Sequence, residues 1–451
     1  MLIGKIDLLI KNINYKIHYL IKQIKKLRGI SMDIIALLLF LGVIIIAFVR
    51  KNNAGILALA IGVIAVRIFG MDDKELYGAI SNSMFTTLVG ITLLFAIVNS
   101  TGALKLVAEK IVAASGKRVW LIPIAVFIAG FVVAGVGPGA IPALAIIPAM
   151  AVPVAITVGY NPVMLALIGE CGLMAGRMTP ITPEGQIITT VAEGVGIENV
   201  MPTILACQTL STIVFSIGLF IIFKGYKLKK PINVIDSKQI EKFNIKQIIS
   251  LISIVVMIAF IIIFDMNVGL AAFAVSAVLI FFNIADEGEC IKSIPWSTIV
   301  MVLGVGAMMT IVDAAGGIDL MSNALSSLMN SKTATPIMSI SAGLMSMVSS
   351  ALAVVYPTMM PMCVDIAKAV GGVDPLALIA AVGVGGSLAG VSPLSTGGAL
   401  ILAAMGSSKK DFNKEEQNKV FVQLFIMSAV GLLVIAVVSI LSFNAITHLM
   451  N

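Results

Sequence analysis

Long apolar runs recur along almost the whole of this chain and constrain its fold more than any other feature. Runs of about 17–25 residues, the length that crosses a bilayer as a helix, recur from residue 33 to residue 443. Charged residues make up only 12% of the chain and its mean hydropathy is +1.08, whereas an average soluble protein carries about twice that charge. Because lipid cannot satisfy free backbone polar groups, spans of this kind must be helical. We therefore predict an all-α polytopic membrane protein.

The spans fall into two series with one order of elements. In each series three spans precede a short amphipathic stretch, a long interrupted apolar segment, an interrupted span and a final span. We interpret the long segment as a re-entrant hairpin and the interrupted span as a broken helix. The spans are predicted at 33–49, 54–69, 84–99, 161–192 and 199–224, then at 247–264, 267–283, 296–313, 375–405 and 419–443; the amphipathic stretches at 103–115 and 317–329; and the hairpins at 119–158 and 333–371.

Matched motifs indicate that the two series arose by duplication. Five spans plus a hairpin that returns to its own side make an odd number of crossings, so the second repeat is predicted to be inverted. We expect repeats at 32–224 and 247–451, joined by a basic loop at 225–246. The matches, at offsets of 211–213, are "MTPITPEGQ" (178–186) with "VSPLSTGGA" (391–399), Asn161-Pro162 with Asp374-Pro375, Pro148 with Pro361, and "FTTLV" (85–89) with "WSTIV" (296–300).

Charge decides the orientation that we predict. With the basic loop in the cytoplasm, eighteen Lys and Arg residues face inward and three face outward (Lys74, Lys332 and Lys368), leaving aside residues 1–31 and the two arginines within spans. Cytoplasmic loops carry the excess of Lys and Arg, so this orientation in the plasma (cell) membrane is expected. The same distribution explains the net charge of +7 without a nucleic-acid partner.

The first 31 residues form a basic amphipathic segment that disagrees with this orientation. They carry seven Lys and Arg residues, and their apolar residues share one helical face. Such a segment lies on a membrane rather than crossing it. Two interpretations stay open: an interfacial helix on the outer side, or synthesis that begins at Met32, directly before the first span.

Residue counts exclude several kinds of site. The chain has two histidines, His18 and His448, near opposite ends, and its four cysteines show no CxxC spacing. A histidine-ligated metal centre is therefore excluded, and the cysteines are interpreted as packing residues. No G-x-S-x-G motif or Walker loop occurs, so we expect neither an enzyme nor a cofactor.

The two predicted helix breaks, 179–185 and 392–398, are the strongest candidates for a site. A break in mid-membrane frees backbone groups at several kcal/mol each, so it survives only where it lines a polar cavity. Hydroxyls, amide N–H groups and half-helix N-termini suit a carboxylate, and loose carbonyls suit a small cation. We expect an organic anion, together with a coupling ion that is Na+ or H+. The substrate hydroxyls are those of Thr179, Thr182, Ser392, Ser395 and Thr396, and the coupling-ion residues are Glu184, Gly185, Gly397 and Gly398.

Two charged residues flank the first break, and two interpretations of them stay open. Arg177 and Glu184 are a self-neutralising buried pair, or Arg177 binds a substrate carboxylate while Glu184 serves the coupling ion. The second repeat has Gly390 and Gly397 at the equivalent positions, so duplication alone did not place this charge.

The order of spans, amphipathic arm, hairpin and broken helix, given twice, resembles the ion transporter superfamily, whose best-known branch is the divalent anion–sodium symporters. Within it, "GVGPGAIPALAIIPAMAVPVA" (135–155) and "SPLSTGGALILA" (392–403) are most similar to MatC-type malonate and dicarboxylate carriers. The resemblance covers about residues 32–443. It implies hairpins and broken helices that move as one body, in the manner of an elevator, against the scaffold of a homodimer.

The hairpin tips depart from the symporter pattern. There each tip carries Ser-Asn-Thr, which binds the substrate carboxylate and sodium. The matching positions here are Pro138-Gly139-Ala140 and Ala351-Leu352-Ala353, which offer no side-chain donor. The resemblance therefore points to backbone contacts, including Gly139, and to Ser349 and Ser350 as substitutes. We predict a secondary active transporter of small carboxylates, most of all dicarboxylates such as malonate or C4 acids; the alternative is a cation/proton antiporter with Glu184 or Asp365 as the carrier.

Overall fold

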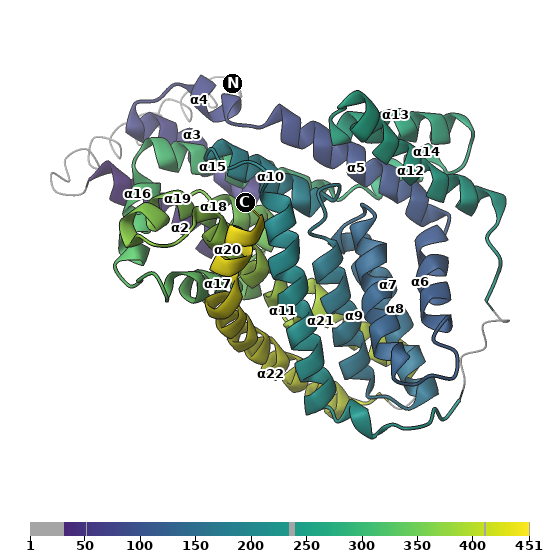
Figure 1. The fold of residues 1–451 in the computed structure, drawn as a ribbon. Helices are drawn as coiled ribbons and strands as arrows, with labels where there is room; N and C mark the ends of the chain where they lie inside the picture. Colours follow the sequence, from purple (N-terminus) through teal and green to yellow (C-terminus); the bar gives the residue numbers. More distant parts are fainter. Residues whose placement is uncertain (1–30, 51, 234–239, 410–411, 451) are drawn as a thin grey trace, which may run out of the picture.

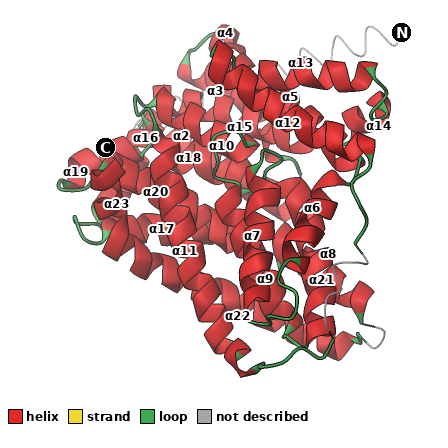
Figure 2. Cartoon of the chain, turned by 45° about the vertical axis from the view of Figure 1, so that its right-hand side comes forward, coloured by secondary structure: helices red, strands yellow, loops and turns green. Residues whose placement is uncertain are grey.

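The computed structural model describes residues 31–50, 52–233, 240–409 and 412–450, and every regular element in these ranges is a helix (Figures 1 and 2). Eight of the described helices are long and apolar enough to cross a membrane, and shorter apolar helices accompany them. The predicted all-α fold is thereby confirmed. The basic segment at 1–31 lies, except for Ser31, outside the described residues.

The first series contains every predicted element and one short helix more. The broken helix and hairpin both appear, because proline and glycine interrupt the apolar runs at the expected places. Its helices are α2 (Met32–Arg50), α3 (Ala54–Phe69), the unpredicted α4 (Asp73–Gly78), α5 (Asn82–Ser100), α6 (Ala103–Ala113), the hairpin legs α7 (Leu121–Gly135) and α8 (Ala140–Val158), the broken pair α9 (Pro162–Gly176) and α10 (Pro183–Gly194), and α11 (Val200–Ile222).

The second series repeats this order. Trp296 begins α15, 214 residues after Asn82 begins α5, and Thr396 begins α21, 213 residues after Pro183 begins α10. The elements are η1 (Gly225–Lys227) in the joining loop, α12 (Ile245–Phe264), α13 (Val268–Phe281), α14 (Glu287–Lys292), α15 (Trp296–Ala314), α16 (Gly317–Ser326), the hairpin α17 (Ala334–Val348), η3 (Ala351–Val355), α18 (Tyr356–Met359) and α19 (Cys363–Val370), the broken pair α20 (Pro375–Leu388), with η4 (Ala389–Val391), and α21 (Thr396–Ser408), then α22 (Lys414–Val438), η5 (Ser439–Phe443) and α23 (Asn444–Met450).

Glycines join the two series by direct backbone contact. A Cβ atom at Gly55 of α3 would lie 2.2 Å from the carbonyl oxygen of Val300 on α15, and one at Gly90 of α5 would lie 2.2 Å from that of Gly269 on α13. Small residues allow such close helix packing in membranes. The second helix of each series therefore packs against a helix of the other series: α3 packs against α15, and α13 packs against α5.

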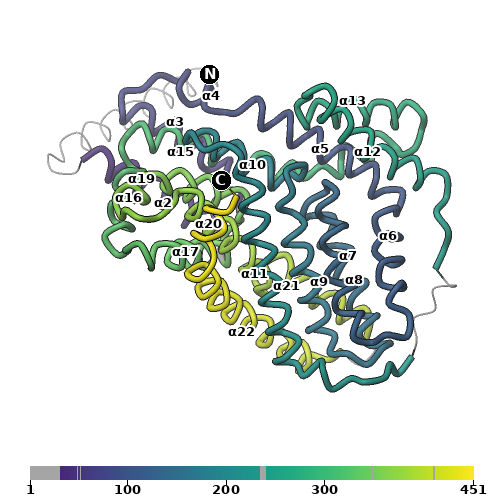
Figure 3. Tube along the Cα trace, viewed as in Figure 1, coloured from purple at the N-terminus to yellow at the C-terminus, as the bar shows by residue number. Residues whose placement is uncertain are grey.

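Each hairpin is packed against its own broken helix in the same way. A Cβ atom at Gly172 of α9 would lie 1.9 Å from the carbonyl oxygen of Phe127 on α7, and one at Gly385 of α20 would lie 2.1 Å from that of Ser339 on α17. Figure 3 shows α22 running beside α11 along the flank of these elements. The first half of each broken helix is therefore packed closely against its own hairpin.

Candidate functional site

The first break is held by the hydroxyl of Thr182. Its Oγ1 donates to the carbonyl oxygens of Arg177 and Thr179, the latter at 2.8 Å, and accepts the N–H of Gly185 at 3.0 Å. Thr182 is therefore the N-cap of α10, as expected for a threonine before a helix that starts with proline. One side chain thus satisfies three of the backbone groups freed by the break.

The second break repeats the two donor bonds of the first at equivalent positions. Ser395, 213 residues after Thr182, donates through Oγ to the carbonyl oxygens of Gly390 and Ser392, the latter at 2.7 Å. Glycines allow each break to fold this tightly: a Cβ atom at Gly185 would lie 2.2 Å from the Thr179 oxygen, and one at Gly398 would lie 2.4 Å from the Ser392 oxygen. The repeated motif is therefore first of all a way to break a helix twice with the same geometry.

A cavity of about 830 Å³ lies between the two hairpins, both broken helices and α15. Arg177 is the one charged residue among those that line it. The cavity brings together six of the residues predicted from the sequence. They are Arg177, Ser349, Ser350, Ser395, Thr396 and Gly397.

Arg177 ends α9 and is buried, with 8% of its surface exposed. Its Nη2 donates to the hydroxyl oxygen of Tyr356 at 3.1 Å, and that hydroxyl donates to the carbonyl oxygen of Gly383 at 3.1 Å. Its Nε has no hydrogen-bond partner within the part of the chain that the structure describes. Among the ion pairs of the described residues, none includes Arg177, so the guanidinium is oriented by a neutral hydroxyl and not by a direct ion pair.

Glu184 links the first break to the tip of the first hairpin. Its Oε1 accepts the N–H of Ala140 at 2.9 Å, whereas Oε2 has no partner. A Cβ atom at Gly139 would lie 2.1 Å from Oε2, so glycine at this position, with φ of 70°, leaves room for the carboxylate. Glu184 lines a second, smaller cavity of about 300 Å³, which shares Ile141, Thr298 and Leu352 with the larger one.

Three of the predicted hydroxyls do not line the larger cavity. Thr179 donates to the carbonyl oxygen of Gly135 at 2.7 Å and ties the break to the first hairpin. Thr182 and Ser392 are fully buried, and Ser392 Oγ accepts the N–H of Leu394 at 3.3 Å. These side chains hold the backbone because a broken helix uses the nearest hydroxyls to satisfy its own free groups.

Sequence reasoning missed several polar residues that face the cavity or orient Arg177. Ser387 lines the cavity and its buried Oγ has no partner, and Ser346 donates to the carbonyl oxygen of Gly386 at 2.7 Å. Ser297 and Thr298 line it from α15. Tyr356 lies 179 residues from Arg177 along the chain. No local pattern marks Ser346, Tyr356 or Ser387, whereas Ser297 and Thr298 lie in the repeated "WSTIV" motif, which in the sequence indicates only duplication.

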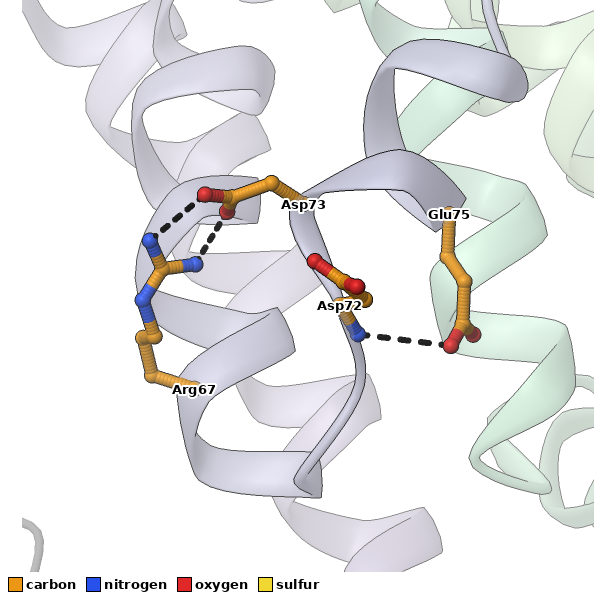
Figure 4. Close-up of polar contacts among 4 residues, drawn as sticks. All are labelled: Arg67, Asp72, Asp73 and Glu75. Atoms are coloured by element: carbon orange, nitrogen blue, oxygen red, sulfur yellow. Dashed lines mark hydrogen bonds and ion pairs between the residues drawn. The ribbon is translucent and has the colours of Figure 1, made fainter.

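A charged cluster at the end of α3 lies apart from both cavities. Arg67 binds both carboxylate oxygens of Asp73, with 2.9 Å between Nη2 and Oδ2, and the N–H of Asp72 donates to Glu75 (Figure 4). Both side chains of the Arg67–Asp73 pair are about half exposed. Arg67 thus differs from Arg177, which is buried and forms no ion pair.

Buried charge, repeated breaks and a mid-molecule cavity define the class of polytopic transporters with discontinuous helices. The profile of the CitMHS citrate transporter family matches residues 44–385, and the chain belongs to this family. It is a multi-pass membrane protein and a secondary transporter of organic anions, and it is not an enzyme. This result agrees with the superfamily resemblance, while the MatC branch stays a prediction.

The structure is similar to that of the YdaH transporter of Alcanivorax borkumensis, whose description reports an unusual topology. The TM-score is 0.54 at 13% sequence identity, over 81% of this chain and 86% of that chain. At this identity the likeness supports the fold alone. A search of curated proteins found no match.

Proposed function

We propose that this protein is a secondary active transporter that carries small dicarboxylates, such as malonate or C4 acids, across the plasma membrane. The observation that carries the proposal is the cavity of about 830 Å³ with Arg177 as its one charged lining residue. A single buried cation, surrounded by hydroxyls, favours an anion over a cation as substrate.

The donors around the cavity support two anchor points for the anion. Arg177 takes one carboxylate, through the fork geometry that suits a planar acid group. The second carboxylate is held at the N-terminus of α21, where Thr396 and Gly397 line the cavity and the helix dipole favours negative charge. A tricarboxylate such as citrate, after which the family is named, would leave its third carboxylate to neutral hydroxyls.

The coupling ion, Na+ or H+, is proposed to bind beside the breaks. Glu184, with its unpartnered Oε2, and the backbone of Gly185, Gly397 and Gly398 are the groups that we assign to it. An ionisable side chain buried in a membrane protein is most often functional. The rival carrier for cation/proton antiport, Asp365, is partly exposed and pairs with Lys368 at 3.4 Å, which is an ordinary pair at i and i+3.

An elevator mechanism in a homodimer is part of the proposal, and the bonds between elements of one chain support the body that moves in it. The first break is tied to its own hairpin by Thr179 and Glu184 and to the second hairpin by the bond from Arg177 to Tyr356. We propose that α7–α10 and α17–α21 move together, while α3, α5, α13 and α15 form the scaffold.

Binding to the purified protein tests the proposed substrate. Titration calorimetry with malonate, succinate and citrate is expected to give a Kd for one of the dicarboxylates that is about tenfold below that of citrate, because one unpaired carboxylate costs roughly 1.4 kcal/mol or more. Tighter binding of citrate would contradict the preference for dicarboxylates. Binding of none of the acids, by protein that exchanges Na+ for H+ in vesicles, would favour the antiporter.

A further inference from the structure

Glu170 is a buried carboxyl group without any hydrogen-bond partner. It lies on α9, is 0% exposed, and neither Oε1 nor Oε2 has a hydrogen-bond partner among the described residues. A carboxylate in such a place loses its hydration without compensation. A buried carboxylate of this kind needs a cation to compensate its charge during the transport cycle, and the smallest such cation is a proton.

The carboxyl group of Glu170 faces the start of α21. A Cβ atom at Gly397 would lie 3.1 Å from both of its oxygens, and α21 is a helix of 13 residues that packs against α9. Gly397 also lines the substrate cavity, as does Met174, one turn after Glu170. Glu170 and a bound anion would therefore share one helix N-terminus from two sides.

Few other titratable groups surround Glu170. The helices packed against α9 are α7, α8, α11, α20 and α21; four of them carry no titratable side chain within their bounds, and α11 carries Cys207. On α9 itself Cys171 is adjacent, and Arg177 follows two turns later at the cavity. Among the described ion pairs, none includes Glu170.

We propose that Glu170 carries the proton that couples transport: its carboxyl group must be protonated for the anion to bind at the N-terminus of α21. The inference rests on the proposed function and deepens it: with a proton as the coupling ion, the residue that carries it is Glu170 in place of Glu184. An ionised Glu170 and a substrate carboxylate at the same helix end repel each other in a medium of low dielectric constant. Protonation removes this repulsion, so proton and anion each favour the binding of the other.

The step involves one O–H bond. A Glu170 oxygen takes a proton from the side on which the anion enters, and releases it on the side to which the anion leaves. Glu184 fits this role less well, because its Oε1 accepts the backbone N–H of Ala140, and a donor of this kind stabilises the charged form.

The test separates coupling from transport itself. Proteoliposomes are assayed for accumulation of labelled succinate driven by a pH gradient and, without a gradient, for exchange of labelled for unlabelled succinate. We expect the wild-type protein to perform both, and Glu170→Gln, which mimics the protonated state, to keep exchange while gradient-driven accumulation falls by about tenfold or more. Glu193→Gln, which changes an exposed carboxylate on α10, is the matched control and is expected to keep both.

The outcomes distinguish the two proposals. Gradient-driven accumulation by Glu170→Gln at the wild-type level would overturn the role of Glu170. The same conclusion would follow if the wild-type protein exchanged succinate but accumulated none of it under a pH gradient. Absence of both activities from the wild-type protein would instead overturn the proposed function.

A measurement on the wild-type protein guards against a variant that does not fold. Raising the pH ionises Glu170 and weakens anion binding, so the Kd for succinate is expected to rise, by up to about tenfold per pH unit for one linked proton. A Kd that stays constant over the whole pH range in which the protein remains folded would contradict the proposal.

Discussion

Arg177 is the residue on which the proposed chemistry depends most. Its guanidinium is buried, is held by Tyr356 through one nitrogen, and is the one charged group among the residues that line the cavity. A cation so placed costs free energy in the empty protein and regains it when an anion binds. This balance is the physical basis of an anion site within a membrane protein.

Arg177→Lys is expected to raise the half-saturation concentration for succinate uptake by about 10–100-fold, because an ammonium group cannot form the bidentate pair. Uptake kinetics in proteoliposomes measure this change, with membrane abundance checked by immunoblot. Arg67→Lys, at the exposed pair with Asp73, is the control and is expected to change uptake by less than about twofold. Unchanged kinetics in Arg177→Lys would leave Arg177 a structural role only.

Tyr356→Phe tests the orientation of Arg177. Loss of the hydroxyl removes the bond from Nη2 and leaves the carbonyl oxygen of Gly383 without this donor, so we expect the half-saturation concentration to rise by about 3–10-fold, for roughly 1 kcal/mol per bond lost. The maximal rate is expected to stay within about twofold, since the variant keeps the ring that packs the hairpin. A fall in maximal rate at constant half-saturation would contradict a role in orientation.

At the scale of elements, the breaks are structures that the sequence specifies closely. Thr182 and Ser395 donate equivalent bonds to carbonyl oxygens within the two breaks, Thr182 also caps its half-helix, and Gly185 and Gly398 allow the backbone to close on itself. The breaks are therefore built into the native backbone, and their position does not depend on a bound substrate.

Gly185→Ala is expected to destabilise the protein by about 2 kcal/mol or more, because the new methyl group would lie 2.2 Å from the Thr179 oxygen in a place that cannot expand freely. Thermal unfolding in detergent, followed by size-exclusion chromatography, measures the effect. Gly194→Ala, on the same helix and with nothing within 4 Å, is the control and is expected to be neutral or stabilising by up to about 1 kcal/mol. Equal melting temperatures for the two variants would refute the account of the break.

The elements were predictable to different degrees. Hydropathy predicts the positions of the spans because each span must cover the apolar bilayer core. Proline and glycine at matched positions of the two repeats predict the breaks. The second leg of the second hairpin was expected as one segment, yet it is divided into η3, α18 and α19. The short helices α4 and α14 also escaped prediction, since six residues carry too little periodicity to be recognised.

The site itself is a property of the whole molecule, and its sequence prediction was partial for that reason. Arg177 and Thr396 are recognisable in the sequence as polar residues beside a helix break, and Ser349 as one beside a hairpin tip. The structure brings all three to one cavity. Tyr356 and Ser387 acquire their positions only through packing between distant segments, which no local pattern encodes. Conversely, Thr182 and Ser392 are hydroxyl residues beside a break, as the cavity residues are, but their side chains form hydrogen bonds with the backbone of the break.

A cross-link between the proposed moving body and the scaffold tests the elevator mechanism. Leu352 of the second hairpin and Thr298 of α15 line both cavities together. In a protein whose four buried cysteines are replaced by serine or alanine, the pair Thr298→Cys and Leu352→Cys is expected to lose about 90% or more of its uptake on oxidation, since the sliding elements are then fixed. Reductant is expected to restore uptake. Full uptake by the oxidised, demonstrably cross-linked protein would exclude sliding at this interface.

The most direct test of the central claim is uptake of labelled malonate, succinate and citrate into proteoliposomes, with sodium and proton gradients imposed separately. The account predicts saturable uptake, faster for a dicarboxylate than for citrate, driven by the proton gradient and abolished by replacement of Arg177 with alanine. Uptake of none of the three acids, in a preparation that exchanges cations, would contradict it.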